Sequence, residues 1–214
     1  MGFPQCSWLT ITLWRKDLPR DILARYYVPM LRPPRARLAG SIYLLYFLTA
    51  VADEVLVGRH RLVLYDIVNL VAHVLYIAVT LFFYYMFRPV NKRLSLLAAF
   101  FSLAGCANDL LALLNLAPYG ISSLAFFGPY CVLIGWLIYK STFLPRILGV
   151  LMALAGVGWL LFLSPLENLL STYLKVLGFL AEASLMLWLI VKGVNQQRWN
   201  ELAAARGEDA PAVR

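Results

Sequence analysis

Ionisable and hydrogen-bonding side chains recur with helical spacing inside a long apolar stretch, residues 62–87. Intervals of three or four residues separate the members of this polar stripe, which are Asp66, Asn69, His73, Tyr76, Thr80 and Tyr84. This spacing places them on one face of a helix. Because polar groups cost free energy in lipid, the stripe must face the interior of a helix bundle or water.

Other apolar stretches contain chemical partners for the stripe. The candidate ligand site consists of Asp66, Asn69, His73, Asp109, Lys175 and Glu182, with Asp53 and Glu54 at its mouth. We expect one interior cluster that opens outward and has His73 and Glu182 at its floor. Carboxylates and a histidine, which titrates near neutral pH, can relay protons or hold a cation or a polar headgroup. In a purely structural alternative, Lys175 neutralises one carboxylate and hydrogen bonds join the helices.

The residue inventory favours neither a metal centre nor a serine nucleophile. The only histidines are His60 and His73, and there is no HExxH motif and no pair of closely spaced cysteines. We therefore expect no metal and no other cofactor. A GxSxG motif is also absent.

Three functional classes follow from these residues. The leading hypothesis is a protein that binds or moves a small polar or lipid-headgroup ligand through an outward-facing cavity. The second is an intramembrane enzyme that acts on a lipid or isoprenoid headgroup, with Asp or His as acid or base. The third is a structural or accessory membrane subunit with no ligand.

The composition identifies the environment of these residues. Hydrophobic residues make up 62% of the 214 residues and charged residues only 14%, whereas about a quarter of a soluble domain is charged. A soluble fold of this length has too little interior for so much apolar surface. Six stretches are apolar enough to cross a bilayer: Leu38 to Val57, Leu62 to Phe87, Leu94 to Leu116, Ile121 to Tyr139, Ile147 to Leu163 and Leu169 to Val191. We predict an all-α, polytopic membrane protein, a bundle of six transmembrane helices.

The basic residues predict the orientation of this bundle. Lys and Arg gather before the first stretch, in the second and fourth connections and after the last stretch. The positive-inside rule then places both termini in the cytoplasm. We expect a multi-pass protein of the inner cell membrane. Its net charge of +8 comes from basic residues that we expect to contact anionic lipid headgroups and not nucleic acid. A homo-oligomer and a complex with a partner subunit both stay open.

The chain divides into three parts by composition. Residues 1–37 form a basic arm, which is either an interfacial helix or an over-long start, with Met30 as the alternative to Met1. Residues 38–193 form the transmembrane domain, and residues 194–214 form a polar cytoplasmic tail that begins as a frayed helix. Within the fifth stretch the small residues Gly149, Ala153, Gly156 and Gly158 predict a packing surface.

Several short motifs resemble one known family. They are Arg37 to Leu44 (RLAGSIYL), Arg88 to Lys92 (RPVNK), Gly135 to Ser141 (GWLIYKS) with Leu144 to Leu151 (LPRILGVL), and Val191 to Asn195 (VKGVN). Together they resemble the bacterial membrane proteins with domain of unknown function 4386, over residues 31–197. The resemblance implies a multi-span membrane protein without an assigned reaction. The family often has a histidine where this chain has Tyr130.

Overall fold

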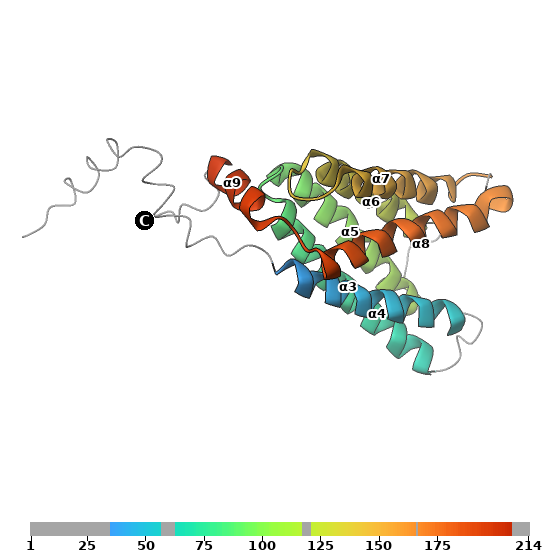
Figure 1. Cartoon of the computed structure of the whole chain (residues 1–214). Helices are drawn as coiled ribbons and strands as arrows, with labels where there is room; N and C mark the ends of the chain where they lie inside the picture. Colours follow the sequence, from blue (N-terminus) through green and yellow to red (C-terminus); the bar gives the residue numbers. More distant parts are fainter. Residues whose placement is uncertain (1–34, 57–62, 117–120, 166, 207–214) are drawn as a thin grey trace, which may run out of the picture.

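The computed structural model describes residues 35–56, 63–116, 121–165 and 167–206, and this part of the chain is entirely helical. Within it lie seven helices and no strand, arranged as Figure 1 shows. They are α3 (Ala36–Leu56), α4 (Val63–Phe87), α5 (Lys92–Leu113), α6 (Leu124–Lys140), α7 (Arg146–Leu161), α8 (Glu167–Val191) and α9 (Gln196–Arg206). The helices α3 to α8 coincide, within a few residues at each end, with the six predicted apolar stretches.

Three of these helices are long and apolar enough to cross a membrane. Their qualifying segments are Tyr65–Phe87 in α4, Lys92–Leu113 in α5 and Leu169–Val191 in α8. The other apolar segments are shorter: Ala36–Ala52 in α3, Leu124–Lys140 in α6 and Arg146–Leu161 in α7. Large apolar side chains also lie exposed on the outside of the bundle, such as Leu48, Phe100 and Ile147. Such a surface is stable in lipid and not in water.

The six apolar helices pack in sequence order, and the last closes back on the first. Each of α3 to α7 packs against the helix that follows it, and α8 packs against α3. Figure 1 shows α3 and α4 on one side of the bundle, α6 and α7 on the other, and α8 between them. Buried side chains such as Tyr43, Phe83 and Leu185 fill the interior. Short connections between successive helices produce this antiparallel order.

Glycine allows α6 and α7 to approach until their backbones touch. A Cβ atom at Gly149 would lie 2.6 Å from the carbonyl oxygen of Gly135, and one at Gly156 would lie 2.7 Å from that of Gly128. The predicted packing surface in this segment is therefore confirmed for Gly149 and Gly156, which face α6. Gly158 faces Leu174 and Leu177 of α8 instead. We call the contact between α6 and α7 the glycine seam.

The polar tail forms a separate helix where the sequence predicted a frayed extension of the last span. Gly193 ends α8 with a positive φ of 69°, a conformation that side chains other than glycine rarely adopt, and its N–H donates to the carbonyl of Trp188 at 3.0 Å. The helix α9 then packs back onto the bundle. The indole N–H of Trp199, a buried side chain, donates to the carbonyl of Met86 at 2.9 Å. The helix α9 therefore lies at the end of the bundle where α4 finishes.

Candidate functional site

A pocket of about 660 Å³ lies among α3, α4, α5 and the start of α6. Its polar lining consists of Tyr46, Tyr65, Asp66, Asn69, His73, Tyr76, Asp109 and Asn115, and its apolar lining consists of Ala50, Ala72, Ala112, Leu113 and Phe127. Small-molecule pockets in proteins have volumes of roughly 300–1,000 Å³. The cavity is therefore large enough for a small ligand.

The helix α4 contributes its polar stripe to this pocket over the first half of its length. Asp66, Asn69 and His73 line the cavity, as the helical spacing predicts. Further along α4 the stripe becomes part of the helix packing. Thr80, which is 1% exposed, lies with its hydroxyl 2.6 Å from the hydroxyl of Ser102 on α5. One face of α4 therefore provides both a cavity wall and an interhelical hydrogen bond.

His73 and Asp109 form the central contact of the site. The Nε2 atom of His73 lies 3.2 Å from Oδ2 of Asp109, and the two side chains are 13% and 32% exposed. The Nδ1 atom lies 2.8 Å from the carbonyl oxygen of Asn69, four residues earlier on the same helix. A carbonyl oxygen only accepts hydrogen bonds, so the Nδ1 atom carries a hydrogen and donates it.

Because Nδ1 donates within α4, Nε2 is the nitrogen that faces Asp109. We call this contact the His73–Asp109 pair.

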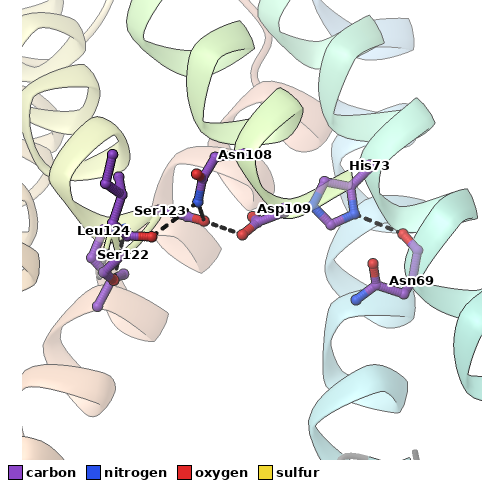
Figure 2. Close-up of polar contacts among 8 residues, drawn as sticks. Asn69, His73, Asn108, Asp109, Ser122, Ser123 and Leu124 are labelled. Atoms are coloured by element: carbon purple, nitrogen blue, oxygen red, sulfur yellow. Dashed lines mark hydrogen bonds and ion pairs between the residues drawn. The ribbon is translucent and has the colours of Figure 1, made fainter. Parts of the chain in front are cut away.

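The second oxygen of Asp109 extends this network to α6. The hydroxyl of Ser123, directly before α6, donates to Oδ1 of Asp109. The amide of Asn108 donates to the hydroxyl of Ser123 at 3.0 Å and to the carbonyl of Ile121 at 3.2 Å. Figure 2 shows these side chains in a row from α6 across α5 to α4. The hydroxyl of Ser123 donates to the carboxylate and not to a histidine, so the row is not a serine–histidine nucleophile pair.

Ser123 is the member of this network that the sequence did not indicate. A serine before an apolar stretch is typical of a helix N-cap. However, Ser123 makes no capping hydrogen bond with its side chain and contacts Asp109 instead. Only the packing of α5 against α6 brings the two residues together. The amino-acid sequence alone contains no signal for the contact between Ser123 and Asp109.

The structure does not bring Glu182 and Lys175 into this pocket. Glu182 on α8 accepts a hydrogen bond at 3.1 Å from the hydroxyl of Tyr43, which is 2% exposed. The ring of Tyr43 stacks on that of Tyr46 with centroids 5.9 Å apart, and Tyr46 lines the pocket. Lys175 is exposed on α8 and is not part of the pocket lining. The side chains of Asp53 and Glu54, predicted at the mouth, lie outside the part of the chain that the structure describes.

Metal ligands do not gather within the described residues. No three His, Cys, Asp or Glu side chains of this part of the chain lie close enough together to hold a metal ion. Cys106 and Cys131 are buried as free thiols. The chemistry of the pocket is therefore that of two carboxyl groups, one imidazole, two amides and several phenol rings.

Three helices are long and apolar enough to cross a membrane, and two of them, α4 and α5, line a polar pocket; this combination identifies a helical membrane protein. The chain belongs to the family named for domain of unknown function 4386, whose model matches residues 119–193. It is also similar to an uncharacterised protein of the archaeon Archaeoglobus fulgidus, with 33% identity over 129 residues, which are 56% of this chain and 78% of that protein. No solved structure matches the chain. The family resemblance inferred from the sequence motifs is thus confirmed.

Proposed function

We propose that this protein binds or moves a small polar or lipid-headgroup ligand in the pocket among α3, α4, α5 and α6. The observation that carries this proposal is the pocket itself, because Asp66, Asn69, His73 and Asp109 all line one cavity. A bundle that used these groups only as packing contacts would bury them against each other. Thr80 and Ser102 illustrate that alternative, since their hydroxyls touch and both side chains are buried.

We further propose that the bundle crosses the membrane six times, with both ends in the cytoplasm and the pocket open to the outer side. Asp66 near the start of α4 and Asn115 after the end of α5 line the pocket, so the pocket lies at the end of the bundle opposite α9. Basic residues of the described chain gather at the α9 end: Arg35, Arg37, Arg88, Lys92, Arg93, Lys140, Arg146, Lys192, Arg198 and Arg206. The positive-inside rule favours this end as the cytoplasmic one.

A cysteine-accessibility experiment tests the cavity and its direction together. In a protein whose native cysteines are replaced, Ala72→Cys places a thiol in the pocket lining. Val71→Cys places a thiol at the same depth of α4 on the exposed apolar surface. We expect a membrane-impermeant thiol reagent added to intact cells to modify Ala72→Cys and to leave Val71→Cys unmodified, because lipid covers the second position.

Ala205→Cys completes the test of orientation. This exposed residue on α9 should react only after the membrane is permeabilised. An Ala72→Cys variant that stays unmodified from outside would contradict the outward-open pocket. Reaction of Ala205→Cys in intact cells would contradict the cytoplasmic position of the α9 end.

A further inference from the structure

The pocket lining contains more acidic than basic side chains. Asp66 is exposed within the pocket, and Asp109 supplies the second carboxyl group. No lysine or arginine is among the lining residues that the structure describes. Two carboxyl groups, of Asp66 and Asp109, outnumber the one imidazole of His73, so the described lining has a net negative formal charge. An anionic ligand would meet repulsion and no counter-ion there, whereas a cation would be attracted.

Aromatic rings form the inner wall of the same pocket. The rings of Tyr46 and Tyr76 have centroids 4.6 Å apart, and Phe127 packs edge-on against Tyr76 with centroids 5.4 Å apart. All three residues line the cavity, together with Tyr65. Aromatic rings attract alkylated ammonium groups, because the negative ring face contacts the cation while the ring also covers its methyl or methylene groups. A metal ion would gain much less from such a wall.

We propose that the pocket binds an organic monocation, an amine or a quaternary ammonium group, with Asp66 and Asp109 as its counter-ions and Tyr46, Tyr76 and Phe127 as its aromatic wall. This inference rests on the proposed function of the pocket as a ligand site and adds the chemical class of the ligand. The ammonium group belongs either to a soluble molecule or to a lipid headgroup. Both sources present the same cation to the same residues.

A comparison of probes with equal shape and different charge tests the ligand class. The full-length protein is placed in nanodiscs of phosphatidylglycerol, which has no ammonium group, and titrated with choline, methylammonium, 3,3-dimethylbutan-1-ol and inorganic phosphate. The alcohol has the shape of choline without its charge. We expect choline or methylammonium to bind about tenfold or more tightly than the alcohol, because the alcohol forfeits both the ion pair and the cation–π contact. Phosphate should not bind.

Matched variants connect the binding to the pocket. Asp66→Asn and Asp109→Asn each remove one carboxylate from the lining and should weaken binding of the cation about tenfold or more. Glu201→Gln makes the same change on α9, where Glu201 is exposed and contacts Gln197. This control should bind the cation with the affinity of the unaltered protein. The unfolding temperature without ligand, measured for each variant, separates loss of binding from loss of fold.

The lipid content of the nanodiscs distinguishes the two sources of the cation. If a headgroup is the ligand, discs that contain phosphatidylethanolamine or phosphatidylcholine should compete with the added cation. If a soluble molecule is the ligand, the affinity should be the same in all discs. Both results support the organic cation.

Three results would overturn the inference. They are binding of the neutral alcohol as tightly as choline, binding of phosphate in preference to the cations, and absence of binding by both cations. An accessible Ala72→Cys together with any of these results would reject the cation and leave the ligand pocket intact. An inaccessible Ala72→Cys would reject the proposed function itself.

Discussion

The glycine seam and the polar pocket differ in how closely neighbouring helices approach each other. At the seam, missing side chains let α6 and α7 approach until a Cβ at Gly149 would lie 2.6 Å from the carbonyl of Gly135. At the pocket, polar side chains of α4 and α5 surround a cavity of about 660 Å³. Close backbone packing supplies the van der Waals contact that holds helices together in lipid. We infer that the seam holds the bundle while the pocket keeps room for a ligand.

Substitution of a seam glycine should have the largest effect on folding. A Cβ at Gly149 would meet backbone atoms of Gly135 and Tyr139, which have no rotamer that moves them away. We expect Gly149→Ala to lower the free energy of unfolding by about 1–3 kcal/mol or more, as overpacking of a tight interface does. Unfolding in mixed detergent measures this loss.

Gly158→Ala provides the matched control on the same helix. A Cβ at Gly158 would lie 3.3 Å from Leu174 and 3.8 Å from Leu177, and both contacts are side-chain ends that can rotate. The control should unfold close to the unaltered protein. Equal loss in both variants would show that α7 tolerates no added methyl group anywhere, and that the seam is not special.

Two substitutions of Asp109 should separate the effect of its charge on stability from the effect of its hydrogen bonds. In Asp109→Asn the amide can still donate to Nε2 of a neutral His73 and accept from Ser123, so the fold should be retained. Asp109→Leu removes the contacts of Asp109 with both His73 and Ser123. We expect this variant to lose about 1–3 kcal/mol in the free energy of unfolding. Thermal unfolding of the two variants side by side measures the difference. A large loss in Asp109→Asn would mean that the carboxylate charge itself is needed for folding.

The contact between Glu182 and Tyr43 tests where the pocket ends. Tyr43→Phe removes the hydroxyl that donates to Glu182 and keeps the buried ring. We expect a loss of about 0.5–1.5 kcal/mol in stability and an unchanged ligand affinity, because neither residue lines the pocket. A ligand titration of the variant checks this. A marked loss of affinity would extend the site to Glu182.

The hydrogen bond between Thr80 and Ser102 should have the smallest effect. Interhelical side-chain hydrogen bonds in membrane proteins contribute about 0.6 kcal/mol on average. A double-mutant cycle with Thr80→Val and Ser102→Ala should give a coupling energy of that order. A coupling several times larger would mean that polar contacts hold this bundle as firmly as the glycine seam does.

Much of the helical architecture could be predicted because it is local. The apolar stretches appear in the structure as α3 to α8, and the spacing of Asp66, Asn69 and His73 placed them on the one face that lines the cavity. The packing role of Gly149 could also be read from the spacing of small residues. These features depend on the periodicity of a single helix.

The remaining features depend on how neighbouring helices are rotated. Glu182 was expected beside His73, but α8 packs against α3 and turns Glu182 toward Tyr43. Ser123 joins Asp109 only because α5 and α6 are adjacent. The docking of Trp199 on Met86 likewise joins residues far apart in the chain. Rotation of one helix against the next is not encoded in the spacing within either helix.

Native mass spectrometry of the protein, released gently from its membrane, tests the central claim most directly. We expect a discrete co-purified mass on the unaltered protein and on Glu201→Gln, and its loss on Asp109→Asn, because the proposed site places the ligand against the His73–Asp109 pair. The identity of that mass would also define the ligand. A bare polypeptide in all three samples, or the same bound mass in all three, would contradict the assignment of this pocket as the ligand site.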